Sequence, residues 1–319
     1  MKKIIIIIGI VFSIASLAQD SNFSIPLKNW NIKIVGLDNY YPTYLADPLG
    51  VKFQVLSQNM VYSDFEHQDK VNAGGDYSGK LTVSPGARIS LLKFASKKNP
   101  NLGFEFDLGM QVPMVMRAGN HDLIESDGIY YFALAGRPTD WLALRFSKHH
   151  ICTHIGDEFS SGIVQTPVDY DPNITQLPVR DDFILSAAVK PLYFLGNPKL
   201  DILQVYGDFG FFLPGVDFMG RRQNKPNRTA YLNLQGGAEL EYYFNHTYLG
   251  GVYSGINVSS YQLNAFSPNI SFSAGYIVPQ ERNKKKVRFG FNYYNGRSLS
   301  NQFYNRKEKS LSFSLAVDI

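Results

Sequence analysis

The densest group of potentially reactive side chains in this sequence lies between Lys148 and Phe159. Three of the six histidines fall here, beside the only cysteine and two adjacent carboxylic acids. Period-two alternation in an extended strand places His150, Cys152 and His154 on one face. An imidazole beside a thiol can generate a thiolate nucleophile. His150 and Cys152 are therefore candidate catalytic residues of a hydrolase.

The same cluster offers ligands for a metal ion. His150, His154, Asp157 and Glu158 supply the nitrogen and oxygen atoms that zinc and similar divalent ions take. A third interpretation is purely structural, with these side chains hydrogen-bonding a long loop onto the rest of the fold. No further catalytic group is identifiable, which argues against an enzyme. No cofactor is predicted other than a divalent metal at this place.

The N-terminal residues have the pattern of a cleaved signal peptide over residues 1–18. Lys2 and Lys3 precede an apolar run that ends in Ser16-Leu17-Ala18, a small-x-small cleavage site. An uncleaved anchor is the alternative. The rest of the chain has no long apolar run, but it is rich in Tyr and Phe, with 20 and 23 residues. Those aromatics favour strands and the interfacial girdles of an outer-membrane β-barrel.

From residue 51 onward the sequence alternates between apolar and polar residues in short segments. The last segment is the clearest: Leu311, Phe313, Leu315 and Val317 alternate with small or polar residues up to Ile319. We expect a closed antiparallel transmembrane β-barrel of about twelve strands over 51–319. The expected strands are 51–65, 81–94, 102–116, 129–135, 141–154, 183–195, 200–212, 230–244, 247–259, 268–278, 287–294 and 309–319. Ten strands is an alternative, because 51–65 has polar residues on its apolar face and 129–135 is apolar on both faces.

The connections support the barrel because they alternate between long and short. The expected long loops are 66–80, 117–128, 155–182, 213–229, 260–267 and 295–308, and the expected short turns are 95–101, 136–140, 196–199, 245–246 and 279–286. Outer-membrane barrels have short periplasmic turns and long outer loops. We therefore predict an outer-membrane location with both termini in the periplasm. Residues 19–50 would form a periplasmic or plug-like extension.

The inward face of the predicted strands carries charges of both signs. The predicted lumen charges are Arg88, Glu105, Asp107, Arg145, Lys190, Asp208, Glu239, Glu241 and Arg288. Buried charges of opposite sign tend to pair, and a barrel of this size has limited interior width. The sequence therefore predicts a salt-bridged interior, with a narrow polar channel as the alternative. The expected role is structural or that of a narrow channel.

Two motifs resemble a known family. Tyr44-Leu45-Ala46-Asp47-Pro48 comes first, and Trp141 and Arg145 then lead to His150-x-Cys152-Thr153-His154-x-Gly156-Asp157-Glu158-Phe159. Together they resemble the domain-of-unknown-function 1207 family of bacterial outer-membrane proteins. Cys152 and Thr153 stand where that family usually has two serines. The resemblance implies an envelope barrel and no established activity.

Possible partners follow from the predicted location. Outer-membrane lipids and lipopolysaccharide would surround the barrel, and the last strand resembles the signal that the barrel-assembly machinery reads during insertion. A modest formal charge of +4 and the lack of any recognition motif exclude nucleic acid as a partner.

The cluster around His150 is similar in one respect to outer-membrane phospholipase A and the lipid A deacylases, which hold a His-x-Ser pair at the rim. An acyl hydrolase of phospholipid or lipid A is therefore the alternative function. An adhesin using loops 155–182 and 213–229 is another, since Arg221, Arg222, Lys225 and Arg228 make the second loop basic.

Overall fold

The computed structural model describes residues 24–63, 79–119, 121–156, 179–196, 202–214, 231–244, 247–279, 286–304 and 306–318. Several of the predicted features lie outside these residues. They are the signal peptide, the two acids Asp157 and Glu158 of the candidate metal site, and the basic loop residues Arg221, Arg222, Lys225 and Arg228.

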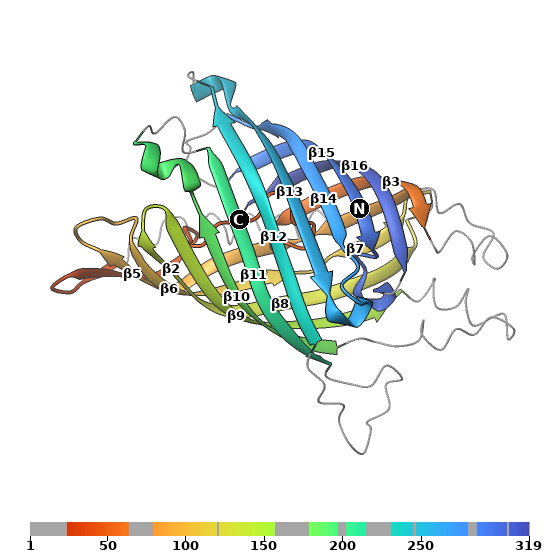
Figure 1. Cartoon of the computed structure of the whole chain (residues 1–319), viewed down its shortest axis with the longest axis horizontal. Helices are drawn as coiled ribbons and strands as arrows, with labels where there is room; N and C mark the ends of the chain where they lie inside the picture. The colour runs from red at the N-terminus through yellow and green to blue at the C-terminus, as the bar shows by residue number, and fades with distance from the viewer. Residues whose placement is uncertain are drawn as a thin grey trace, which may run out of the picture.

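Sixteen described strands form a single antiparallel sheet that curls into a barrel (Figure 1), and the pairing of β8 with β9 closes the ring. The strands of the first half are β1 (Ser24–Pro26), β2 (Trp30–Gly36), β3 (Phe53–Ser63), β4 (Gly79–Ser84), β5 (Gly86–Ser96), β6 (Gly103–Gln111), β7 (Met114–Arg117) and β8 (Leu123–Thr139). Those of the second half are β9 (Leu142–Ile155), β10 (Val179–Val189), β11 (Leu203–Pro214), β12 (Tyr231–Tyr243), β13 (Gly251–Tyr261), β14 (Asn269–Ile277), β15 (Val287–Arg297) and β16 (Lys307–Val317).

Twelve strands cross the barrel wall. β4 and β5 are one crossing interrupted at Pro85, and β6 and β7 are one crossing interrupted at Pro113. Proline lacks the N–H that a central ladder needs, so each break falls where a ladder bond is missing. The two interruptions face each other, since Val112 donates its N–H to the Pro85 carbonyl at 2.9 Å. Counting each interrupted pair once and leaving out β1 and β2 gives twelve, as the sequence predicts, and excludes ten.

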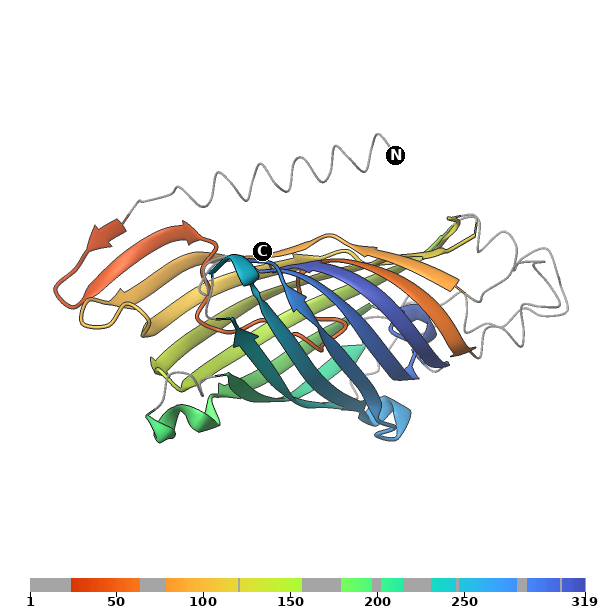
Figure 2. The same ribbon diagram turned by 90° about the horizontal axis from the view of Figure 1, so that it is seen from above.

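The two N-terminal strands form a hairpin that extends the wall at one end of the barrel. β3 pairs with β4, from Gly79 to Ser84. β2 pairs with the continuing part of the same crossing, from Ser90 to Ser96 of β5. β3 pairs only with the β4 part of this crossing, so the edge of β5 is free of β3. The hairpin pairs with that edge through β2. Figure 2 shows it projecting at one end of the barrel.

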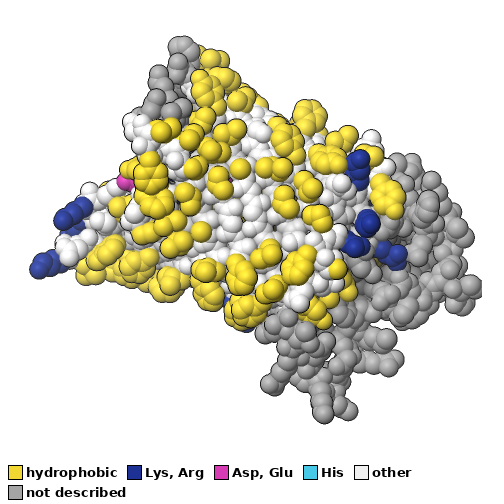
Figure 3. All heavy atoms as spheres, in the orientation of Figure 1, with side chains coloured by type: hydrophobic (Ala, Val, Ile, Leu, Met, Phe, Trp, Pro, Cys, Tyr) yellow, Lys and Arg dark blue, Asp and Glu magenta, His cyan; other side chains and the backbone are white. Residues whose placement is uncertain are grey.

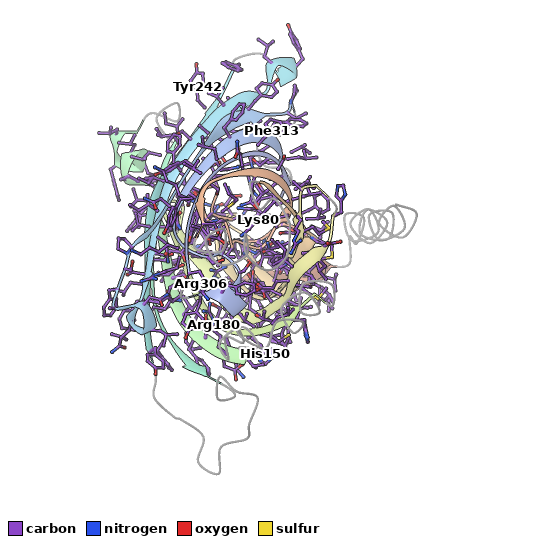
Figure 4. All side chains as sticks on the ribbon, turned by 90° about the vertical axis from the view of Figure 1, so that its right-hand side faces the viewer. Lys80, His150, Arg180, Tyr242, Arg306 and Phe313 are labelled. Atoms are coloured by element: carbon purple, nitrogen blue, oxygen red, sulfur yellow. The ribbon has the colours of Figure 1, made fainter. Side chains whose placement is uncertain are left out.

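Apolar side chains cover the outside of the wall, and polar ones line the inside. On the face shown in Figure 3, hydrophobic side chains spread over the strands while charged ones gather near the two ends. The exposed fractions of Phe132, Phe209 and Phe291 are 58%, 56% and 71%. Looking along the barrel, Figure 4 shows Tyr242 and Phe313 outside the ring and Lys80 within it. This is the alternation predicted from the sequence.

Two sequence expectations about the connections are wrong. Residues 117–128 are not a long loop, because β7 continues to Arg117 and β8 begins at Leu123. The charged residues Glu125 and Asp127, which resemble a loop, are buried on the inner face of β8. The expected strand 183–195 ends at Val189 instead, since Pro191 starts a 3-10 turn. That turn lengthens the expected short connection 196–199 to 190–202.

Helical structure in the described residues is confined to 3-10 turns. They are η1 (Pro191–Leu195), η3 (Thr247–Leu249), η4 (Gln262–Asn264) and η5 (Asn301–Phe303). No helix in the described part of the chain is long and apolar enough to cross a membrane.

Candidate functional site

Residues 37–52, which we call the plug segment, cross the inside of the barrel between β2 and β3. At one side the Tyr40 N–H donates to Glu105 of β6 at 2.6 Å. At the other side the Leu45 and Ala46 N–H groups donate to Glu239 of β12. These two acids lie far apart in the ring, with β8, β9, β10 and β11 between their strands. The plug segment is therefore held from both sides of the lumen.

The plug segment packs through aromatic side chains onto small residues of the wall. Tyr41 and Tyr44 are 1% and 4% exposed and hydrogen-bond each other through their hydroxyls. They form one buried cluster with Tyr206 and with three wall alanines, Ala135, Ala143 and Ala188. Small side chains on the wall leave room for the large ones of the plug. This packing explains why 129–135 is apolar on both faces: one faces outward and the other faces the plug segment.

Ten charged side chains inside the barrel form five ion pairs, as the sequence predicts. The buried or partly buried ion pairs are Lys80–Glu308 at 2.5 Å, Arg88–Asp107 at 3.2 Å, Arg180–Asp182 at 3.2 Å, Lys286–Glu241 at 2.5 Å and Arg288–Asp318 at 2.6 Å. Because a buried charge is costly without a partner, this pairing lets a charged interior remain compact.

Most of the predicted lumen charges contact either the plug segment or one another. Asp208 accepts a hydrogen bond from the Tyr44 hydroxyl at 2.8 Å. Arg88 donates to the Tyr41 carbonyl at 3.1 Å as well as to Asp107. Glu105 and Glu239 accept hydrogen bonds from plug N–H groups. Glu241 forms an ion pair with Lys286, and Arg288 forms one with Asp318. Lys190 differs, because it lies in the turn after β10 rather than within a wall strand.

Several inward charges were missed by the sequence prediction. They are Lys52, Lys80, Lys93, Glu125, Asp127, Arg180, Asp182, Glu308 and Asp318. Lys93 escapes notice because a register shift between Ser90 and Leu92 reverses the alternation and turns it inward. Glu125, Asp127, Arg180 and Asp182 were assigned to loops. The alternation from Glu125 through Asp127 and Ile129 to Tyr131 is the signal that would have found the first two.

A cavity of about 160 Å³ lies inside the barrel beside the plug segment. The plug contributes residues from Pro42 to Val51, and turns near η4 and η5 contribute Asn264 and Asn301. Between them the wall supplies amides, tyrosines and three arginines: Asn233, Gln235, Asn257, Asn269, Tyr131, Tyr261, Tyr294, Arg88, Arg145 and Arg180. His149 also lines it, which the sequence analysis did not propose. This ring faces inward on β9, stacks on Tyr131 with centroids 4.8 Å apart, and contacts the Ser147 hydroxyl at 2.9 Å.

The candidate residues around His150 lie on the outer face of β9, as alternation predicts. His150 and Cys152 are partly buried and His154 is exposed. His150 Nδ1 lies 2.9 Å from Asp181 of β10, whereas the Cys152 thiol donates to the Gly128 carbonyl of β8 at 3.6 Å. The two side chains therefore interact with opposite neighbours of β9. Among the described residues they form no hydrogen bond with each other, and no group of three metal-binding side chains is found.

Comparison with known proteins gives only structural likenesses. No protein-family model matches the chain, and no curated protein matches it in sequence. Outer membrane phospholipase A from Escherichia coli is similar at a TM-score of 0.48 and 10% identity, over 85% of this chain and 93% of that one. The NanC porin is similar at 0.42 and 8%, over 84% and 98%. An anion-selective porin from Comamonas acidovorans gives 0.31 and 9%, over 83% and 98%. At these values the similarity carries no functional information.

The fold and the site together define the class of this protein. It is a closed, twelve-strand antiparallel β-barrel whose interior holds a segment of its own chain. The resemblance to the domain-of-unknown-function 1207 family stays a prediction.

Proposed function

We propose that this chain is an integral outer-membrane β-barrel whose lumen is closed by its own plug segment, with both termini in the periplasm. Its role would be structural, or that of a narrow channel that conducts only when the plug segment moves. The single observation that carries this proposal is the plug segment itself, bound to Glu105 on one side of the ring and to Glu239 on the other.

The outer surface supports membrane insertion. Ring closure pairs each of the twelve wall strands with a neighbour on both sides, as hydrocarbon requires of a backbone that crosses it. Most of the outward side chains are apolar. Aromatic side chains gather at the end of the barrel that holds the tight turns. Trp141 packs on Phe194 with ring centroids 5.2 Å apart, and Phe194 and Tyr248 are 67% and 72% exposed. Aromatic residues at this position suit the interface between lipid and water.

The orientation follows from the strand count and the turns. An even number of crossings puts the start of β3 and the end of β16 at the same end of the barrel. The tightest described connection, Asp140–Trp141 between β8 and β9, lies at that end. Because outer-membrane barrels keep short turns in the periplasm, we assign this end to the periplasm. Lipids and lipopolysaccharide would surround the wall, and the barrel-assembly machinery would insert it.

Conductance in a planar bilayer tests the closure. We expect the wild-type protein to show only rare, small openings. The double variant Glu105→Gln/Glu239→Gln weakens the plug at both anchors and should open more often and conduct more. Glu241→Gln is the matched control, because Glu241 pairs with Lys286 and makes no hydrogen bond to the plug segment.

Three outcomes would contradict the proposal. The first is steady wild-type conductance equal to that of the double variant, and the second is a variant lacking residues 37–52 that inserts but stays silent. The third is a mature chain that fractionates with soluble proteins instead of the outer membrane. Trypsin gives an independent readout of the plug, because Lys52 is 1% exposed. Cleavage after Lys52 should be slow in the wild type and faster in the double variant.

A further inference from the structure

We infer that the cavity inside the barrel is a binding site for a small polyhydroxylated carboxylate about the size of one sugar ring. The inference rests on the proposed closure only in that the plug segment forms part of the cavity surface. Four observations carry it: an arginine that forms no ion pair among the described residues, an acid two strands away from it, a row of amide and hydroxyl side chains on the lining, and the volume of the cavity.

Among the described residues that line the cavity, Arg145 is the arginine that forms no ion pair. Arg88 and Arg180, which also line the cavity, are paired with Asp107 and Asp182. Arg145 instead lies over the rings of Tyr41 and Tyr131, with its guanidinium carbon 4.4 and 5.4 Å from their centroids. Its Nε is buried without a hydrogen-bond partner among the described residues. A guanidinium fork held flat by two rings is preorganised for a carboxylate.

Asp208 lies on the same stretch of wall as Arg145, two strands away. Both residues pair in register with Ser186 of β10, Arg145 from β9 and Asp208 from β11. Two strand spacings separate the two backbones by roughly 10 Å. Asp208 already accepts the Tyr44 hydroxyl, and further lone pairs can accept hydroxyl groups of a ligand. A ligand with an anionic group at Arg145 and hydroxyl groups toward Asp208 would give the guanidinium an acceptor and the carboxylate further donors.

A row of polar side chains along the lining offers hydrogen bonds to the hydroxyl groups of a ligand. Following the same register across the wall, Asp208 pairs with Gln235, Gln235 with Ser259, and Ser259 with Asn269. All four of these residues line the cavity. Amides both donate and accept, which suits hydroxyl groups of either orientation.

The size of the cavity limits the ligand. An apolar cavity of about 150 Å³ accommodates one benzene molecule, and this cavity is about 160 Å³. A ligand built on one six-membered ring is of this scale. The other acids on the lining, Asp47 and Asp182, oppose a second anionic group. The ligand class is therefore a monoanion, with the uronic acids as the simplest examples.

Isothermal titration calorimetry of the full-length protein in detergent tests the proposed ligand class. The three probes share one sugar ring and differ in charge: glucuronate is an anion, glucose is neutral and glucosamine is a cation. We expect glucuronate to bind about tenfold tighter than glucose, and glucose tighter than glucosamine, the tenfold step being about 1.4 kcal/mol. Binding of glucuronate should weaken at high salt. Equal affinities for glucuronate and glucose, a preference for glucosamine, or no binding of any of the three would each overturn the inference.

Variants locate the site. Arg145→Gln should reduce glucuronate affinity at least about tenfold and leave the affinity for glucose almost unchanged. Lys148→Gln removes the same charge from the outer face of the same strand and should bind like the wild type. If Arg145→Gln fails to fold, Arg145→Lys keeps the charge but loses the fork and should show an intermediate loss. Wild-type glucuronate affinity in every folded variant would overturn the assignment. Because titration needs no conductance, its failure is distinguishable from failure of the plug proposal.

Discussion

Tyr44 of the plug segment and Tyr206 of β11 lie face to face inside the barrel, with ring centroids 3.6 Å apart and ring planes 11° apart. The Tyr206 hydroxyl also donates to Asn257 of β13 at 3.0 Å. Tyr206 thus joins the plug segment to three neighbouring wall strands, because β12 lies between β11 and β13. Tyr206 therefore holds the plug segment in place, and its own position is fixed by the hydrogen bond to Asn257.

Replacing the Tyr206 ring should release the plug segment. Tyr206 is 4% exposed, and removing a large buried aromatic side chain costs about 3–5 kcal/mol. We expect Tyr206→Ala to lower the free energy of unfolding by about 3 kcal/mol and to speed trypsin cleavage after Lys52. Tyr206→Phe keeps the stacking, loses one hydrogen bond and should cost only about 1 kcal/mol. Equal cleavage rates in both variants would show that the stacking does not seat the plug.

A glycine next to a buried tyrosine gives a second prediction. Gly109 of β6 pairs in register with Tyr131 of β8, and a Cβ at Gly109 would lie 2.1 Å from the Tyr131 ring. Gly109→Ala should therefore lower the unfolding free energy by about 1–3 kcal/mol through overpacking. Gly207→Ala is the matched control, since the nearest atom to its Cβ would be 3.8 Å away. Urea unfolding of both variants in lipid vesicles measures the difference, and similar losses in both would contradict the prediction.

Much of the wall could be predicted from the sequence because lipid-facing and lumen-facing side chains alternate strictly. The pattern from Leu311 to Val317 needs only that alternation, and β16 has it. The prediction failed where another rule overrides the pattern. A bulge beside Leu91 turned Lys93 inward, Pro191 ended β10, and inward acids at Glu125 and Asp127 resembled a loop.

The interior site was less predictable because it depends on contacts between distant parts of the chain. Alternation alone predicts that Arg145 and Asp208 point inward. It does not show that both pair in register with Ser186 of β10, one from each neighbouring strand. The pairing of Glu239 with the N–H groups of Leu45 and Ala46 joins residues separated by almost two hundred positions. No local pattern reports such a contact.

Acid should loosen the N-terminal hairpin. Asp38 follows β2 and lies 2.9 Å from the buried ammonium of Lys93. Burial alone would raise the pKa of Asp38, but Lys93 and Lys33 outweigh it and hold that pKa below its ordinary value of 3.8. A lowered pKa means that this contribution to stability is complete above pH 3.8 and is lost as the pH falls through the value in the folded protein.

Trp30 reports on the hairpin, because its ring packs edge-on against Phe104 with centroids 5.6 Å apart. In a Trp141→Phe background it is the only tryptophan, since the chain has two. We expect its fluorescence to change below pH 4 in this background, and Asp38→Asn to show the acid-like signal already at neutral pH. Identical pH profiles with and without Asp38→Asn would rule out the carboxylate as the cause.

The outer pair His150–Asp181 should matter little for stability. Their side chains are 29% and 36% exposed, and ion pairs near the surface contribute about 0–1 kcal/mol. We expect His150→Ala to change the unfolding free energy by less than about 1 kcal/mol. His149→Ala, one residue away but stacked inside the barrel on Tyr131, should lower the unfolding free energy by more.

Turnover of labelled phospholipid and lipid A should be equal in the wild type, His150→Ala and Cys152→Ala. A loss of turnover in both variants, with folding intact, would instead establish the acyl hydrolase that their separate hydrogen bonds argue against.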